Sequence, residues 1–226
     1  MDKSATPEQL VIFGTGPIAE LAWFYFTHDS RYEVVAFSVD REYLVAQAFC
    51  GLPVVPFDEV EERYPAASHS MFIALSYSGL NKLRQEKCEQ ATAKGYLLAS
   101  YLSSKATVWP GFVLGGNCFV LEDNTIQPFA TIGDNVTLWS GNHIGHHSTI
   151  EDHCFIASHV VVSGGVVIGE RCFVGVNATI RDHVNIGARC VIGAGALINA
   201  DAEPDGVYSA PPAERSRVPS HRLKRI

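Results

Sequence analysis

The chain has 226 residues, of which 47% are hydrophobic and 18% charged, which suits one or two compact domains with substantial cores. Its formal net charge is −7 and its only basic cluster is the C-terminal SRVPSHRLKRI, so neither a nucleic acid nor a lipid surface is expected as a partner. The N-terminal MDKSATPEQLVIF lacks the apolar run of a signal peptide, and no window is apolar enough for a membrane span, so we expect a cytoplasmic protein.

Residues 10–40 predict a strand, a glycine turn, a helix and a second strand. The apolar LVIF ends at Gly14-Thr15-Gly16, a helix-forming run follows, and YEVVAFSVD ends in Asp40. In such a βαβ unit, backbone N–H groups at the helix N-terminus favour a phosphate, and an acidic residue at the end of the second strand can accept bonds from a ribose or a base. The pattern indicates nucleotide binding, but it is also typical of a simple tight turn between strand and helix.

The elements that follow extend this unit. MFIALS at 71–76 predicts a third buried strand, residues 81–95 predict a helix that ends on a glycine, and YLLASYLSS predicts a last strand that leads into the second half of the chain. This is half of a doubly wound α/β fold. A full dinucleotide domain needs more chain, so a redox cofactor is not expected.

The second half of the chain has a hydrophobic repeat with a period of six. Counting in sixes from Val108 gives sixteen Val, Ile or Leu residues, the last of which is Ile198. Glycine often follows the aliphatic residue, where we expect a turn with positive φ, and the residue four positions on is usually small or apolar. Such a period fits neither an α-helix nor hairpins and predicts a three-sided solenoid of short parallel strands, with eighteen residues in a coil.

Two sets of residues recur at the interval of one coil. Cys154, Cys172 and Cys190 predict an inward column of reduced thiols, although that stacking also lies within reach of a disulfide. Asn124 and Asn142 predict an inward ladder of hydrogen-bonded amides.

The repeated motif [LIV]-G-x-x-[small]-x between residues 108 and 203 resembles that of the hexapeptide-repeat acyltransferases. Its position directly after a half-Rossmann unit resembles the bacterial sugar acetyltransferases of the PglD/NeuD type. The resemblance implies an α/β half-Rossmann N-terminal domain, a left-handed parallel β-helix and a homotrimer. It divides the chain into a nucleotide-sugar-binding domain at 1–103, a β-helix acyltransferase domain at 104–203 and a C-terminal loop and tail at 204–226.

The resemblance also implies the chemistry: acetyl-CoA acetylates the amine of a UDP-, GDP- or dTDP-linked amino sugar in bacterial glycan biosynthesis, such as that of an O-antigen polysaccharide. The amine must lose a proton as it attacks the thioester, so a histidine suits the role of general base and no metal is expected. The family motif around this base matches Ile144-Gly145-His146 and assigns the role to His146. The family then has an acidic residue where this chain has His147, so the group that orients His146 is unidentified, and His143 is a rival base.

The resemblance assigns further residues to the two substrates. Ser158-His159-Val160 matches a histidine near the thioester, and Gly164-Gly165 would let a pantetheine arm pass close to backbone N–H groups that could bind the oxyanion. Tyr208 matches a tyrosine in the family's closing loop, although this chain lacks the glycine of that loop. The candidates for the cofactor are His159, Gly164, Gly165, Ala196 and Tyr208, and those for the substrate are Gly14, Gly16, Pro17, Asp40, Arg41, Ser76 and Asn142.

Two other functions stay open. The same scaffold could O-acetylate a sugar of the sialic-acid type, for which an arginine is expected near the histidines, but Arg171 and Arg189 are not obviously placed there. A non-catalytic trimer, or one that binds metal through histidines shared between subunits, is the second alternative, because zinc favours imidazole. His153 and His183 have the outward phase of His147, and we expect them on a solvated face.

Overall fold

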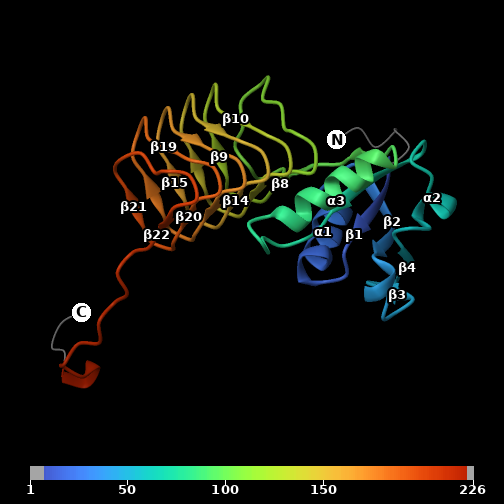
Figure 1. The fold of residues 1–226 in the computed structure, drawn as a ribbon, viewed down its shortest axis with the longest axis horizontal. Coiled ribbons are helices and arrows are strands. Elements are labelled where there is room, and N and C mark those ends of the chain that lie inside the picture. The colour runs from blue at the N-terminus through green and yellow to red at the C-terminus, as the bar shows by residue number, and fades with distance from the viewer. Residues whose placement is uncertain (1–7, 223–226) are drawn as a thin grey trace.

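The structure is a computed structural model that describes residues 8–222. An α/β sheet flanked by helices is followed by a three-sided parallel β-helix, and the last part of the chain runs away from the final coil (Figure 1). Residues 1–7 of the N-terminal stretch and the last four residues of the basic tail lie outside the described part of the chain. Among the described residues, none of the helices has the length and apolar character needed to cross a membrane.

The α/β sheet has the strand order β3-β4-β2-β1-β5-β6. Its centre is the predicted βαβ unit, in which β1 (Glu8–Phe13) and β2 (Tyr32–Val39) lie parallel and are connected by helix α1 (Pro17–His28). The predicted third strand is β5 (His69–Ile73), which pairs with the other side of β1, and the predicted second helix is α3 (Lys82–Ala93). The last four residues of β1 are buried, as a central strand requires.

The chain between Asp40 and β5 forms elements for which the sequence showed no strong pattern. They are η1 (Arg41–Tyr43), β3 (Ala48–Phe49), β4 (Leu52–Pro56) and α2 (Val60–Arg63). Strand β4 lies parallel to β2, and β3 folds back against β4 in antiparallel orientation at the edge of the sheet.

The single strand predicted over YLLASYLSS is wrong, because the chain divides it between two sheets. Strand β6 (Leu97–Leu98) pairs with β5 in the α/β sheet, whereas β7 (Tyr101–Leu102) pairs with β8 (Phe119–Val120) and starts the β-helix. The two parts of the chain are therefore joined without a linker.

The β-helix consists of two-residue strands in three parallel sheets, which confirms the solenoid predicted from the repeat. Ile144 pairs in register with Ile126 and Val162, so each coil has eighteen residues. The orders are β10-β13-β16-β19, β22-β20-β17-β14-β11-β8-β7 and β21-β18-β15-β12-β9. The strands after β8 are β9 (Thr125–Ile126), β10 (Thr131–Ile132), β11 (Thr137–Leu138), β12 (His143–Ile144), β13 (Thr149–Ile150), β14 (Phe155–Ile156), β15 (Val161–Val162), β16 (Val167–Ile168), β17 (Phe173–Val174), β18 (Thr179–Ile180), β19 (Asn185–Ile186), β20 (Val191–Ile192), β21 (Leu197–Ile198) and β22 (Val207–Tyr208).

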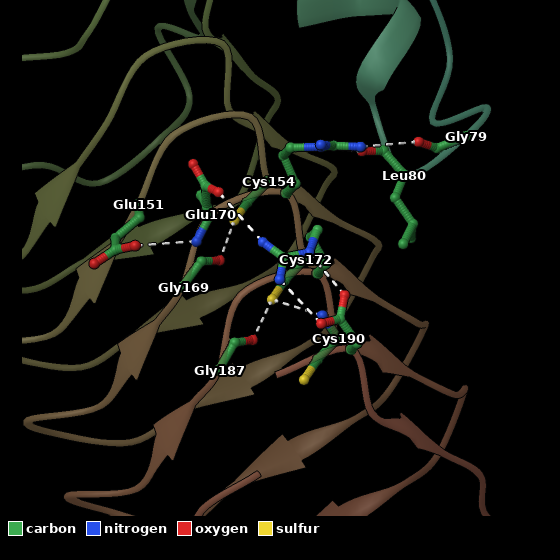
Figure 2. A network of polar contacts seen from close by, with 12 residues as sticks. Gly79, Leu80, Glu151, Cys154, Gly169, Glu170, Cys172, Gly187 and Cys190 are labelled. Carbon is green, nitrogen blue, oxygen red and sulfur yellow. Dashed lines mark hydrogen bonds and ion pairs between the residues drawn. The ribbon is translucent and has the colours of Figure 1, made fainter. Parts of the chain in front are cut away.

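The interior of the β-helix is filled as the sequence predicts. From β8 to β21, the second residue of each strand is the predicted aliphatic side chain, and all of them are buried. Cys154, Cys172 and Cys190 stack on successive coils (Figure 2), and all three thiols are free. The N–H of Cys190 donates to Sγ of Cys172 at 3.3 Å, and burial raises the pKa of the Cys154 thiol. The prediction of a reduced, structural column is confirmed.

The inward asparagines do not form the predicted amide ladder. Asn142 Oδ1 accepts from the N–H of Val160 at 2.7 Å, and Nδ2 of both Asn124 and Asn142 donates to the carbonyl of Trp139. Each amide thus closes a turn of the backbone. A ladder of amides does exist at a corner of the coil, where Asn117 Nδ2 donates to Asn135 Oδ1 at 2.9 Å.

The glycines after the aliphatic residues are needed for space, not for positive φ, which corrects the prediction. A Cβ on Gly145 would lie 2.5 Å from the carbonyl carbon of Ser163, and one on Gly169 would lie 2.7 Å from the nitrogen of Ala188. Positive φ occurs two residues later, at the corner of the turn. Besides glycines at some coils, the residues in this left-handed conformation are Asn117, Asp123, Phe129, Asn135, His147, His153, His159, Arg171, Asn177, His183 and Arg189.

Helix α3 and the loop before it pack on one side of the β-helix. The buried guanidinium of Arg84 donates to Thr137 Oγ1 at 2.6 Å and to the carbonyl of Asn135 at 2.9 Å. The ring of Tyr77 lies 4.9 Å from that of Phe155. Near the loop residues Gly79 and Leu80 (Figure 2), Nε of Arg171 donates to the carbonyl of Leu80 at 3.3 Å.

Candidate active site

His146 and His147 form an imidazole pair at one corner of the β-helix. Their Nδ1 atoms are 3.1 Å apart, so one ring donates a hydrogen bond and the other accepts it. Both side chains are exposed. The backbone N–H of His146 donates to Oε1 of Gln127 at 2.9 Å, which ties this corner to the preceding coil. The partner of His146 that the sequence left unidentified is therefore the histidine that replaces the acidic residue.

A cavity of about 630 Å³ lies on the coil that precedes the histidine pair. Its lining includes Trp109, Gln127 and Phe129, so it shares two residues with the surroundings of the pair. The Phe129 ring lies 4.8 Å from that of His147, and its side chain is 75% exposed. The imidazoles therefore stand beside a hollow with an aromatic wall that is large enough for a small ligand.

The glycine pair Gly164-Gly165 makes room for imidazole rings. A Cβ on Gly164 would lie 2.6 Å from Cε1 of His146, and a Cβ on Gly165 would overlap the ring of His183. We predicted that a pantetheine arm passes close to these two glycines. On this side of the backbone, the rings of His146 and His183 fill that space. Because Gly164 has no side chain, the His146 ring can lie against the backbone of the next coil.

His143 has a different position from the pair. It is the first residue of β12, on a flat side of the coil between Thr125 and Val161, and it is half-buried. Its ring makes no hydrogen bond with any described residue, whereas that of His146 has a partner. This geometry favours His146 over His143 as an oriented base.

His159 lies at another corner of the β-helix. Its ring covers Gly141 of the preceding coil, where a Cβ would lie 2.5 Å from Nδ1. Corners follow each other every six residues, so His147 and His159, twelve residues apart, occupy two different corners of the prism. One protomer does not bring His146 and His159 together.

The two remaining histidines that were predicted to face outward differ in exposure. His183 is exposed, as predicted. The prediction for His153 is wrong, because it is half-buried at the third corner, where Nδ1 lies 3.0 Å from Asn135 Nδ2, and burial lowers its pKa. Among the described residues, no group of three or more His, Cys, Asp or Glu side chains is arranged to hold a metal ion.

The α/β part has its own cavity, of about 470 Å³, at the carboxyl ends of β1 and β2. Gly14 and Asp40 both line it, as does Lys87 of α3, whose Nζ lies 2.6 Å from Asp40 Oδ1. Gly16 precedes the first residue of α1, Pro17, so the predicted N-terminal turn is present. Arg41 does not line the cavity and instead pairs with Asp58 and Glu59.

The remaining predicted site residues lie outside the two cavities. Asn142, a candidate for the substrate, and Ala196, a candidate for the cofactor, are 1% and 4% exposed, so their side chains fill the interior of the β-helix. The hydroxyl of Tyr208 accepts from the N–H of Glu203 at 3.0 Å in the closing turn. Ser76 is exposed, and its Oγ lies 3.3 Å from Oγ of Ser78, outside both cavities.

A family model of known proteins matches part of the β-helix. The family model described as bacterial transferase hexapeptide (six repeats) matches residues 129–164 and 165–200. Residues 129–200 of this chain are therefore similar to the hexapeptide repeats of bacterial transferases. The left-handed fold class implied by the resemblance is thereby confirmed, together with the α/β region that precedes the repeats. Among curated proteins, none matches the sequence.

Two solved structures are similar to this chain over more than nine tenths of its length. PerB from Caulobacter crescentus, in complex with CoA and GDP-perosamine, is 28% identical, with a TM-score of 0.79 over 91% of this chain and 96% of that one. The acetyltransferase domain of PglB from Neisseria gonorrhoeae is 24% identical, with a TM-score of 0.80 over 92% and 98% of the two chains. The PglB match shows the fold alone.

Three residues of the two cavities were not predicted from the sequence: Gln127, Phe129 and Lys87. Phe129 lies one coil, or eighteen residues, before His147, and Gln127 lies nineteen before His146. Stepping back by one coil from His147 would have found Phe129, and Gln127 lies one residue beyond the same step from His146. Lys87 had no such signal, because its contact with Asp40 joins two distant segments of the α/β part.

Proposed function

We propose that this chain transfers the acetyl group of acetyl-CoA to the amino group of a nucleotide-linked sugar in bacterial glycan biosynthesis. The observation that carries the proposal is the hydrogen-bonded imidazole pair at an exposed corner beside a cavity. It is supported by the relative solved with CoA and GDP-perosamine, in which variants with one histidine replaced by Asn or Ala have also been studied with these ligands.

In this proposal His146 is the general base, and His147 fixes its tautomer. Nε2 of His146 can accept a proton only if Nδ1 already carries one, and that Nδ1–H then donates to Nδ1 of His147, 3.1 Å away. Gln127 holds the backbone of the base in place through the N–H of His146. The pair thus presents a lone pair outward from the corner.

The reaction is a direct attack. The sugar nitrogen forms a bond to the thioester carbonyl carbon and passes its proton to Nε2 of His146. The carbon–sulfur bond then breaks, and the CoA thiolate takes up a proton as it leaves, which restores the neutral imidazole. Backbone N–H groups near the thioester stabilise the oxyanion in between.

The corner geometry supports a homotrimer with shared sites. If His159 contacts acetyl-CoA, as the resemblance implies, it must meet His146 across a boundary between protomers, because the two lie at different corners of one coil. A groove between neighbouring prisms provides this contact in a cyclic trimer. Residues 1–103 would bind the nucleotide through the cavity of Gly14 and Asp40.

The surroundings of the arginines favour N-acetylation over O-acetylation of a sialic-acid-type sugar. Arg171 donates to the carbonyl of Leu80, and Arg189 pairs with Asp205, at the corner of His153 and not at that of His146. Neither guanidinium is free at the imidazole pair to hold a substrate carboxylate.

The test is release of the CoA thiol from acetyl-CoA across UDP-, GDP- and dTDP-linked 3-amino and 4-amino sugars. We expect turnover with one such sugar, and a loss of about 10²- to 10⁴-fold in His146→Ala. The matched control is His28→Ala, an exposed histidine of helix α1 that lines neither cavity. Full turnover in His146→Ala would remove the assigned base, and no thiol release with any amino sugar would contradict the proposed function.

A further inference from the structure

We infer that the cavity of the α/β part selects a guanine nucleotide, through a carboxylate of Asp40 that Lys87 holds in place. The inference rests on the proposed function, since it names the nucleotide of the same substrate. Its grounds are the charge of the cavity lining, the partly buried ion pair in its wall and the exposed apolar side chains among its lining residues.

The Lys87–Asp40 pair is anchored from several sides. Nζ of Lys87 lies 2.6 Å from Asp40 Oδ1 and 2.9 Å from Gln90 Oε1, and it sits 5.3 Å and 5.2 Å from the ring centroids of Phe13 and Phe57. Only 10% of the Lys87 side chain is exposed. The Asp40 side chain is 31% exposed, so the buried ammonium holds in place a carboxylate that a ligand in the cavity can reach.

The lining of the cavity is acidic. Asp40, Glu42 and Glu86 contribute three carboxylates, and Lys87 contributes the only ammonium. Because an acidic wall repels a diphosphate, the phosphates belong at the Gly14 turn and the uncharged base belongs among the carboxylates. Tyr43 and Leu83, which are 63% and 46% exposed, provide large apolar surfaces at the opening against which a flat ring can pack.

The hydrogen-bond edge of the base decides which nucleotide fits. Asp40 Oδ2 has no hydrogen-bond partner in the described part of the chain, and a carboxylate has lone pairs for two parallel donors even when one oxygen also accepts from a lysine. Guanine presents two adjacent donors, N1–H and the 2-amino group. Uracil and thymine present one N–H between two carbonyls, which would face carboxylates, and adenine and cytosine present a single donor group beside an acceptor. Guanine is therefore the base that this wall complements.

The experiment is calorimetric titration of the whole chain with GDP, IDP, UDP, dTDP, CDP and ADP. IDP differs from GDP only in lacking the 2-amino group, so it isolates one of the two donors. We expect GDP to bind roughly 10- to 100-fold tighter than UDP or dTDP, with IDP between them. UDP or dTDP binding as tightly as GDP would overturn the inference and leave the proposed function intact. No binding of any nucleoside diphosphate would count against both.

Two variants complete the test. Asp40→Asn replaces one acceptor by a donor, so it should weaken GDP about tenfold and narrow the gap between GDP and UDP. Glu89→Gln is the matched control, because Glu89 lies on the same helix, outside the cavity, and pairs with Gln85. The Glu89→Gln variant should bind GDP with the same affinity as the chain without substitutions. An Asp40→Asn variant with its GDP preference intact would remove Asp40 as the selecting group, and the titrations of the unchanged chain decide the inference even if that variant folds poorly.

Discussion

At the scale of single residues, the site depends on what accepts the hydrogen bond from His146. A carboxylate partner would attract the imidazolium that forms during the reaction, whereas a neutral imidazole such as His147 orients the ring with little such attraction. His147 stands at a left-handed position, with φ of 59°, which histidine, asparagine and aspartate adopt more readily than most residues. This chain thus keeps an orienting partner for His146 without placing a carboxylate beside it.

Replacing His147 by aspartate tests this distinction. An Oδ atom is as many bonds from Cα as Nδ1, so His147→Asp keeps the hydrogen bond and adds a negative charge next to His146. The charge favours the protonated base, so the acid limb of the pH–rate profile should move to higher pH by about one pH unit, while turnover at alkaline pH changes little. His183→Asp, at the same kind of corner two coils further on, is the control. An unmoved acid limb in His147→Asp would argue against the partnership.

Substitutions at two glycines should distinguish a loss of turnover from a loss of stability. In Gly164→Ala the new Cβ meets the His146 ring, which can move aside, so we expect turnover to fall about tenfold or more with little loss of stability. In Gly145→Ala the new Cβ would lie 2.6 Å from the backbone nitrogen of Gly164, which cannot move, and unfolding should be easier by about 1–3 kcal/mol. Thiol release and urea unfolding on both variants check this contrast. Equal effects on the two measurements would contradict it.

At the scale of elements, helix α3 contacts both parts of the molecule, the α/β sheet and the β-helix. Lys87 lines the cavity of the α/β part, while Arg84, one turn earlier, is buried against the β-helix. Burial lowers the pKa of the Arg84 guanidinium to about 10, so it stays charged at neutral pH and donates to groups on two coils, including the carbonyl of Cys154. The helix therefore fixes the distance between the proposed nucleotide site and the repeats.

Truncating Arg84 should loosen this junction. Arg84→Ala leaves buried acceptors such as Thr137 Oγ1 and the Asn135 carbonyl without their donor and opens a hole under α3, so we expect a loss of about 2–4 kcal/mol in the free energy of unfolding. Arg63→Ala, an exposed arginine at the end of α2, should stay within about 0.5 kcal/mol of the unchanged chain. Urea denaturation of both variants makes the comparison, and equal stabilities would show that Arg84 does not hold the junction.

The same junction shows where prediction from the sequence ends. The inward-facing residues of the coils could be predicted from the sequence. Every coil repeats the same local pattern, with an aliphatic side chain such as Ile144 inside and usually a small or apolar residue four positions on. The contacts of Arg84 and Lys87 join segments that are far apart in the sequence and repeat nowhere, so no local pattern reveals them. The candidate site was predicted to the same extent: His146 came from a motif, whereas the role of His147 as its partner came from the distance between two rings.

At the scale of the whole molecule, the prism separates the proposed base from the proposed acetyl-CoA contact. The corner of His147 continues along the β-helix through Phe129 and Gly165, whereas the corner of His159 continues through Gly141 and Asn177. In the proposed mechanism, a single protomer therefore carries two half-sites on different edges. A cyclic trimer pairs each edge of the first kind with an edge of the second kind on a neighbour, so each of its three grooves holds one complete site.

Subunit mixing tests this arrangement directly. His146→Ala and His159→Ala should each be inactive alone, but trimers assembled from both contain a groove in which an intact His146 of one protomer faces an intact His159 of its neighbour. With equal amounts and random assembly, about one site in four should be complete, so thiol release should recover to about a quarter of that of the unchanged chain. A mixture of His146→Ala with His146→Asn contains no such groove and should stay inactive. Light scattering must show trimers in every sample, and a first mixture that stays as inactive as the second would mean that the two histidines do not complete each other's site across protomers.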